Sequence, residues 1–168
     1  MPVTIRAATR EDLPRIHPVI ERAYRGESAR QGWTHEADLI EGVRTDLDTL
    51  AAIVDDPAQK LLIAEQDGDA LGCVQVSDRG KGLAYLGLLC VEPTIQAGGI
   101  GKKLMEAAER VARDVFEARR IEMTVIDSRA RLIAWYKRHG YSSSGETRPF
   151  PIALDPPLTM TVLVKPFV

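Results

Sequence analysis

The sequence is most distinctive in the segment Leu89-Cys90-Val91-Glu92-Pro93-Thr94-Ile95-Gln96-Ala97-Gly98-Gly99-Ile100-Gly101-Lys102-Lys103. An apolar run ends at Pro93, a short polar link follows, and glycines then open a long amphipathic stretch, an order that predicts strand, loop and helix. Gly98, Gly99 and Gly101 carry no Cβ atom, so a ligand can approach the main chain closely there. The first amides of a helix have no partner inside it and lie at the positive end of its dipole. The segment therefore predicts a site for a phosphate or diphosphate group.

Two other phosphate-binding loops are excluded by the residues around these glycines. A P-loop requires glycine where Gln96 stands, and serine or threonine where Lys103 stands. The dinucleotide motif Gly-x-Gly-x-x-Gly fits Gly99 and Gly101 but meets Leu104 at its third glycine. The pattern Gln-x-x-Gly-x-Gly remains. A plainer interpretation also remains, in which a glycine-rich turn caps a core helix without binding a ligand.

Composition favours a single globular domain spanning residues 1–168, without a polyanion-binding surface. Hydrophobic residues make up 45% and charged residues 27%, and the formal net charge is -2. This balance gives no overall basic field for nucleic acid and no basic arm for a membrane. Cys73 and Cys90 lie in apolar runs without a CxxC partner, so we expect buried free thiols and no metal site. The chain has no signal-peptide pattern and no membrane-spanning run, and we expect a cytoplasmic protein.

Hydrophobic periodicity predicts strands that alternate with helices, and hence an α/β fold with a mixed sheet flanked by helices. The almost wholly apolar run 83–91 is typical of a central strand covered on both faces. Thr9 precedes Asp12 by three residues, as at the start of a capped helix. We expect loops at 78–82 and 149–157, strands at 3–7, 61–65, 71–76, 83–91, 121–125, from Tyr141 and at 159–164, and helices at 9–24, 36–43, 48–54, 99–117 and 129–138.

A second segment, Leu132-Ile133-Ala134-Trp135-Tyr136-Lys137-Arg138-His139-Gly140-Tyr141, supplies a tyrosine on a helix and an aromatic residue after glycine. Together with the Gln-x-x-Gly-x-Gly loop, it closely resembles the GNAT family of N-acetyltransferases over about residues 83–141. Two positions depart from the usual family pattern. Arg129 stands where many members have an asparagine that contacts pantetheine, and Leu132 stands where alanine is usual.

The resemblance implies the GNAT fold, with a mostly antiparallel central sheet, and transfer of acetyl from acetyl-CoA to a primary amine without a metal. It implies that the strand at 83–91 parts from the next strand of the sheet at a bulge, which leaves main-chain groups for the cofactor. The amide of Leu89 would then face the thioester carbonyl, and Val91 would pair with the pantetheine arm. It further implies that the cofactor lies along Leu89, Cys90 and Val91, and that its diphosphate is held by Gln96, Ala97, Gly98, Gly99, Ile100, Gly101 and Lys102. The alternative for Leu89 and Val91 is ordinary strand pairing.

Tyr136 is the candidate general acid that protonates the departing thiolate. The alternative is a core tyrosine whose hydroxyl meets a main-chain group. We assign Trp135 to packing and Tyr141 to the core.

The acceptor side carries no clear motif. In the family, the connection containing Trp33, His35 and Glu36 lines the acceptor pocket, and His35 titrates near neutral pH. Tyr85 stands where some members have a catalytic glutamate, and it can order a water but is a poor base. The general base is left unassigned, and a water relay is the alternative to a base. Glu36 or Asp38 could hold a cationic amine, and Glu146 with the turn Pro149-Phe150-Pro151 could form the opposite wall of the pocket. Solvated loop charges are the plainer interpretation of these acidic residues.

Three functions fit this sequence. The first is an N-acetyltransferase for a small-molecule amine; the second is a protein lysine or N-terminal acetyltransferase; the third is a coenzyme A-binding domain without catalysis. Lys102, Lys103, Arg110 and Arg113 alternate with acidic residues along one predicted helix, so they do not favour nucleic acid. Similar proteins are often homodimers, which is one expectation for the assembly.

Overall fold

The computed structural model describes residues 2–24, 45–151 and 157–167, and of Gln96 and Ala97 it describes the main chain only. The helix predicted at 36–43 lies outside these residues, as do the acceptor-side candidates Trp33, His35, Glu36 and Asp38.

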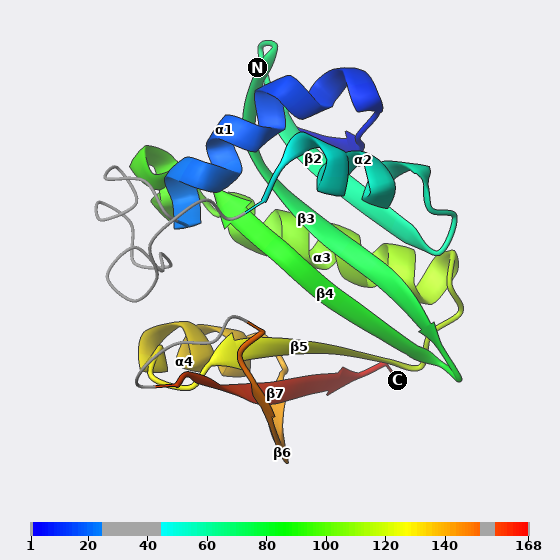
Figure 1. Ribbon diagram of the computed structural model, residues 1–168, viewed down its shortest axis with the longest axis vertical. Helices are drawn as coiled ribbons and strands as arrows, with labels where there is room; N and C mark the ends of the chain where they lie inside the picture. Colours follow the sequence, from blue (N-terminus) through cyan, green and yellow to red (C-terminus); the bar gives the residue numbers. More distant parts are fainter. Residues whose placement is uncertain (1, 25–44, 152–156, 168) are drawn as a thin grey trace.

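Seven strands, four α-helices and two 3-10 helices make up the described part of the chain (Figure 1). In chain order they are β1 (Thr4–Ala7), η1 (Arg10–Asp12), α1 (Leu13–Tyr24), α2 (Leu47–Asp55), β2 (Gln59–Gln66), β3 (Asp69–Gly80), β4 (Leu83–Val91), η3 (Pro93–Gly98), α3 (Ile100–Asp114), β5 (Arg120–Ile126), α4 (Ala130–Arg138), β6 (Ser142–Pro149) and β7 (Thr159–Pro166).

The strands form one sheet in the order β1-β2-β3-β4-β5-β7-β6. All neighbouring strands are antiparallel except β4 and β5, which are parallel. The parallel pair requires a crossover, and α3 supplies it between the two strands. The predicted mixed α/β sheet, mostly antiparallel, is therefore confirmed.

Helices cover both faces of the sheet, as the apolar run 83–91 predicted for β4. Figure 1 shows α1 and α2 on one face of β2 to β4 and α3 on the other. Two buried clusters fill these layers. Cluster 1 lies under α3 and includes Leu62, Val74, Leu86 and Leu104. Cluster 2 lies under α1 and α2 and includes Ile16, Leu50, Ile63, Cys73 and Cys90.

The boundaries of β4 agree with the expected strand, and α3 begins one residue later than expected and ends at Asp114. The loop expected at 78–82 was wrong, because β3 continues to Gly80 and pairs there with Leu83. Thr9 caps η1 as predicted, since its amide donates to the Asp12 carboxylate at 2.8 Å, and α1 follows directly. Among the described residues, no helix is long and apolar enough to cross a bilayer.

Candidate functional site

The central strands β4 and β5 pair over only three residues. Leu83, Ala84 and Tyr85 face Arg120, Ile121 and Glu122, and the parallel ladder ends there. Both strands continue, β4 to Val91 and β5 to Ile126, and Figure 1 shows them diverging. We call the part of these two strands beyond their shared ladder the splay. In the splay, the main chain of β4 is not paired with that of β5.

A bulge in β4 lies inside the splay. Cys73 faces Cys90 and Gln75 faces Gly87 across the β3–β4 ladder, so Leu88 and Leu89 together lie opposite Val74. Leu88 has a φ of 49°, a left-handed conformation that costs a bulky residue about 1–3 kcal/mol. The bulge also reverses which face the side chains occupy. Leu86 packs in cluster 1, whereas Leu88, two residues later, packs in cluster 2.

Beyond the bulge, the main chain of β4 alternates between β3 and the splay. The amide of Glu92 donates to the carbonyl of Leu71 at 2.8 Å, so Glu92 faces β3. Main-chain groups alternate sides along an antiparallel strand, and therefore Cys90 also faces β3 while Leu89 and Val91 face the splay. This direction is the one that the family resemblance implied for Leu89 and Val91.

The main chain and the side chain of Cys90 both point away from the splay. The family resemblance had implied that Cys90, like Leu89 and Val91, lies along the cofactor. Its main chain pairs with Cys73, and its buried thiol lies 3.6 Å from the Cys73 sulfur in cluster 2. The strand period of two residues explains this, because Cys90 lies between two residues that face the other way. Both cysteines are free and buried, as predicted.

The N-terminus of α3 lies directly after β4, separated from it by η3. Gly99 is the N-cap residue, with a φ of 75°, and no side chain caps the helix there. The amide of Lys103 donates to the Gly99 carbonyl at 3.2 Å. The three amides before it, of Ile100, Gly101 and Lys102, therefore have no acceptor within the helix. These groups can donate to an anion, with the helix dipole in support.

The side chains around this terminus differ in their exposure. Lys102 is exposed, whereas Ile100 is buried in cluster 1, so Ile100 can offer a ligand only its main chain. A Cβ atom at Gly99 would have no neighbour within 4 Å, and one at Gly101 would lie 3.7 Å from Val91 and 3.9 Å from Trp135. Trp135 thus packs beside the first turn of α3. The sequence assigned this residue to packing but did not show that it lies next to the glycine-rich loop.

Tyr136 lies on α4 with its ring buried in cluster 1. Its ring packs edge-on against Trp135, at 5.2 Å between centroids, and against Tyr141, at 5.8 Å. Burial raises the pKa of Tyr136 well above its usual value, and the positive charge of Arg129 offsets part of that rise. The phenol is therefore protonated at neutral pH and can donate a proton.

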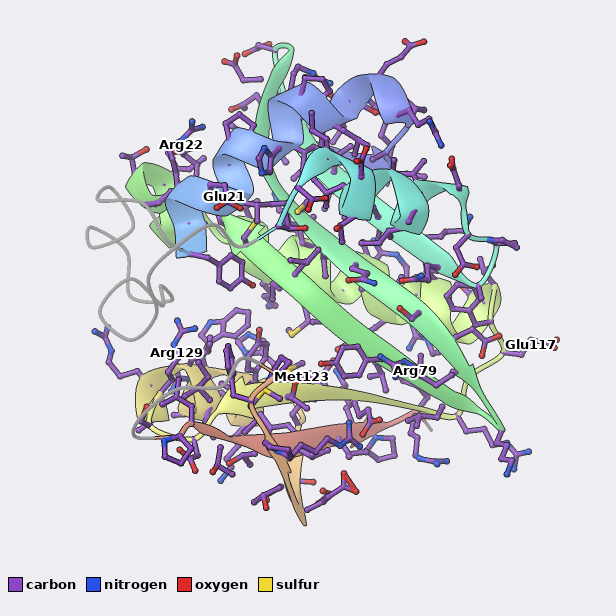
Figure 2. The ribbon with its side chains drawn as sticks, viewed as in Figure 1. Glu21, Arg22, Arg79, Glu117, Met123 and Arg129 are labelled. Atoms are coloured by element: carbon purple, nitrogen blue, oxygen red, sulfur yellow. The ribbon has the colours of Figure 1, made fainter. Side chains whose placement is uncertain are left out.

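Arg129 is the N-cap residue of α4, seven positions before Tyr136. Seven residues are about two turns of a helix, so both residues lie on one face of α4. Figure 2 shows Arg129 at the start of α4 and Arg22 at the end of α1, on opposite sides of the diverging strands.

Tyr85 marks the point where the splay begins. Its hydroxyl is 2.7 Å from the Thr124 hydroxyl on β5, and the Arg79 guanidinium lies over its ring at 4.5 Å. That Tyr85 contacts the acceptor stays a prediction. Glu146 is exposed on β6 and pairs with Arg148, which also binds the buried Glu122.

Tyr24 is a residue at this site that the sequence did not reveal. It is the last residue of α1, and its hydroxyl donates to the Leu89 carbonyl at 2.7 Å. The two residues are 65 positions apart, and no local pattern in the sequence connects them.

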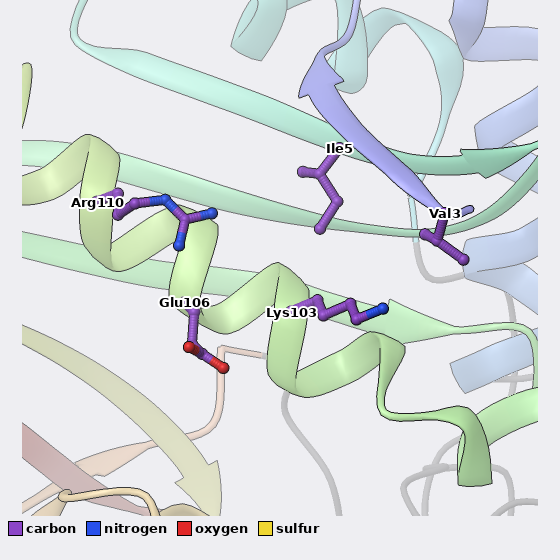
Figure 3. Close-up of a pocket in the computed structure, with 5 residues that line it drawn as sticks. All are labelled: Val3, Ile5, Lys103, Glu106 and Arg110. Atoms are coloured by element: carbon purple, nitrogen blue, oxygen red, sulfur yellow. The ribbon is translucent and has the colours of Figure 1, made fainter.

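A groove of about 280 Å³ lies apart from the splay, between β1 and α3 (Figure 3). Val3 and Ile5 line one side and Lys103, Glu106 and Arg110 the other, and no residue of β4, β5 or α4 contributes. Within the described ranges, no group of three or more His, Cys, Asp or Glu side chains is arranged to hold a metal ion.

Comparisons with known proteins agree with this geometry. Residues 19–141 match the sequence profile of the Acetyltransferase (GNAT) family. A protein of Azospirillum brasilense named IAA acetyltransferase is 32% identical over 107 residues, which are 62% of this chain and 66% of that relative, just under two thirds of its length.

Two solved structures illustrate the likeness in fold. The PaiA N-acetyltransferase of Thermoplasma acidophilum in complex with coenzyme A superposes with a TM-score of 0.76 at 18% identity, covering 99% of this chain and all of the other. YncA of Salmonella typhimurium, described as a putative acetyltransferase with its cofactor acetyl-CoA, gives a TM-score of 0.75 at 18% identity, covering 99% of this chain and 94% of the other.

Proposed function

Because the chain belongs to the GNAT family of acetyltransferases and is therefore an acyltransferase that uses acetyl-CoA, we propose that it acetylates a primary amine of a small molecule by direct attack in a ternary complex. The relative named IAA acetyltransferase supports an acceptor of low molecular weight.

The observation that carries this proposal is the continuity of two stretches of main chain. The edge of β4 that lies beyond its ladder with β5 leads through η3 into the first turn of α3, which no side chain caps. An extended pantetheine arm can lie along the first stretch, with the Leu89 amide as a donor, while a diphosphate accepts hydrogen bonds from the amides of the second. Glycine at positions 99 and 101 keeps the approach to these amides open.

The reaction itself requires a stabilised oxyanion and a protonated leaving group. In our proposal the amide of Leu89 donates to the thioester oxygen as the amine nitrogen attacks the carbonyl carbon. The new C–N bond forms, the C–S bond breaks, and the thiolate takes the proton of the Tyr136 phenol. The attacking nitrogen loses one proton to solvent, and Tyr136 regains a proton from solvent, so protons balance over the cycle.

The acceptor is tested by measuring thiol release from acetyl-CoA with three groups of substrates. These are small amines, lysine-containing peptides, and peptides with a free N-terminus. We expect turnover with members of the first group. Turnover confined to either peptide group would show that the acceptor is a protein, and no turnover despite tight binding of coenzyme A would favour a binding domain.

The cofactor site is tested with a matched pair of glycine variants. Gly99 and Gly68 both have left-handed backbones, at φ of 75° and 84°, and a Cβ atom at either has no neighbour within 4 Å. Alanine therefore strains both positions similarly, but only Gly99 adjoins the α3 amides. We expect Gly99→Ala to weaken coenzyme A binding at least about tenfold by calorimetry, and Gly68→Ala to leave it unchanged. Equal affinities in the two variants would overturn the assignment of this loop.

A further inference from the structure

Two contacts hold the last turn of α1 on the end of β4 that carries the bulge. The Tyr24 hydroxyl donates to the Leu89 carbonyl at 2.7 Å. Two residues earlier in the helix, Arg22 binds the Glu92 carboxylate through Nε at 3.0 Å and Nη2 at 2.7 Å. The last turn of α1 is therefore tied to the main chain at Leu89 and to the side chain of Glu92, just after the end of β4.

The hydrogen bond from Tyr24 lies on the splay side of β4. In an extended residue, the N–H and the C=O point toward the same side of the strand. Since Leu89 faces away from β3, its amide and its carbonyl both point into the splay, and the Tyr24 hydroxyl meets the carbonyl there. The phenol thus stands beside the amide that our proposed function gives to the thioester oxygen.

The main chain needs such a support at this place. Leu88 and Leu89 have no register partner in β3 or in β5, and Leu88 holds a left-handed backbone without being glycine. Strand pairing through Cys90 holds the peptide plane that joins Leu89 to Cys90, but it does not hold the plane that joins Leu88 to Leu89, which carries the Leu89 amide. The Tyr24 ring packs against cluster 2, so the hydroxyl is carried by a side chain whose own position is set by packing.

From these contacts we infer that Tyr24 is a positioning residue for acetyl transfer, whose hydroxyl orients Leu89 so that its amide points at the thioester oxygen. The inference rests on the proposed function, since it presupposes that Leu89 is the donor. Tyr24 acts through the main chain of Leu89 and contributes little to holding coenzyme A, whose phosphates lie at α3. It should therefore affect turnover and leave cofactor affinity almost unchanged.

The test compares Tyr24→Phe with Arg22→Gln. Tyr24→Phe removes only the hydroxyl and keeps the ring, whereas Arg22→Gln breaks the neighbouring contact of the same helix turn with Glu92, at an exposed side chain. We expect Tyr24→Phe to lower kcat about tenfold or more, with the Kd for coenzyme A changed less than about twofold. Arg22→Gln should keep kcat within about twofold of the wild type.

Each other outcome has a defined meaning. An unchanged kcat in Tyr24→Phe would overturn the inference, as would a rise in Kd that matches the loss of kcat. If Tyr24→Phe melts below the assay temperature, the same comparison at a temperature where circular dichroism shows it folded decides the question. Measurements on the wild type test the proposed function separately. If the proposed function is wrong, the wild type will show no turnover or no coenzyme A binding. If only the role of Tyr24 is wrong, the wild type will show both.

Discussion

The Tyr141 hydroxyl donates to the Glu109 carboxylate at 2.8 Å, and this contact ties the start of β6 to the middle of α3. The Lys165 ammonium on β7 approaches the other oxygen of the same carboxylate at 3.0 Å. Glu109 is 6% exposed, so a charge in the core is held by one phenol and one cation. Burial and the nearby Glu109 charge raise the pKa of Tyr141 far above its usual value, so the phenol remains a donor.

Tyr141→Phe should lower the free energy of unfolding by about 1–2 kcal/mol, because the buried carboxylate loses a hydrogen bond and keeps its desolvation cost. Urea denaturation at neutral pH measures the change. The control is Glu106→Gln, an exposed residue of the same helix, which should change stability by less than about 0.5 kcal/mol. Equal stability of wild type and Tyr141→Phe would mean that Lys165 alone satisfies Glu109.

Asp12 should make stability depend on pH in the acid range. Its buried carboxylate accepts two hydrogen bonds from Arg6, at 2.8 and 2.9 Å, one from Arg15 and one from the Thr9 amide. These partners, Arg6 foremost, hold the pKa of Asp12 well below its usual range against the effect of burial. The group is therefore ionised in the folded state at pH values where it is already protonated in the unfolded chain.

A lowered folded-state pKa stabilises the protein above the unfolded-state pKa, and that contribution disappears as the pH falls. We expect Asp12→Asn to cost about 2–3 kcal/mol at pH 7, in line with hydrogen bonds to charged groups. Below about pH 4 the difference from wild type should shrink by about 1.4 kcal/mol per pH unit. Urea unfolding between pH 3 and pH 7, with the exposed Glu11→Gln as control, measures it. A difference independent of pH would contradict the assignment.

Gly72 allows β3 to lie close to β4 near the end of β4, at Cys90 and Val91. A Cβ atom there would overlap the Cys90 carbonyl oxygen and lie 3.2 Å from both the Val91 Cα and the Leu104 side chain. Two of these atoms belong to the main chain and cannot turn aside. Gly72→Ala should cost about 1–3 kcal/mol in thermal or urea unfolding and should also lower acetyl transfer, since it pushes against Val91.

Gly87→Ala is the matched control on the partner strand. Its Cβ atom would meet only side-chain atoms, the Tyr85 ring at 3.3 Å and the Gln75 amide oxygen at 3.5 Å. Side chains can shift by a few tenths of an ångström, so Gly87→Ala should be less destabilising than Gly72→Ala. The reverse order would show that the strands separate easily at Gly72.

The sequence predicted the parts of this site whose geometry is set locally. The apolar run 83–91 predicted β4, because a strand buried on both faces consists almost wholly of apolar residues. The glycines after Pro93 predicted the link and the start of α3, because the left-handed cap residue there is a glycine. β3 was expected to end too early, because Asp78 and Gly80 are typical of turns although they lie here at the exposed end of a long strand.

The family resemblance implied a bulge where the two central strands part, but local patterns did not predict which residue forms it or what supports it. Leu88 takes the left-handed backbone, although the glycine in this run is its neighbour Gly87. The bulge reverses the facing of the side chains, so an alternation counted from Leu86 places Leu88 on the wrong face. The contact of Tyr24 with Leu89 depends on how α1 packs on β4, which only the fold determines.

The raised pKa of Tyr136 leads to a prediction for the pH dependence of turnover. A phenol whose folded-state pKa lies above the usual value of about 10 stays protonated throughout the range in which most assays run. If Tyr136 is the general acid, wild-type kcat should show no descending limb below about pH 10 that depends on this residue. Tyr136→Phe should lower kcat about 10²-fold or more at every pH in that range, with coenzyme A affinity retained.

Tyr141→Phe is the control for loss of a buried phenol beside it, and its kcat should follow the wild type at temperatures where it is folded. A limb with an apparent pKa below 10 that disappears in Tyr136→Phe would show that the buried phenol ionises more readily than its surroundings imply, and an unchanged kcat in Tyr136→Phe would remove it from the reaction.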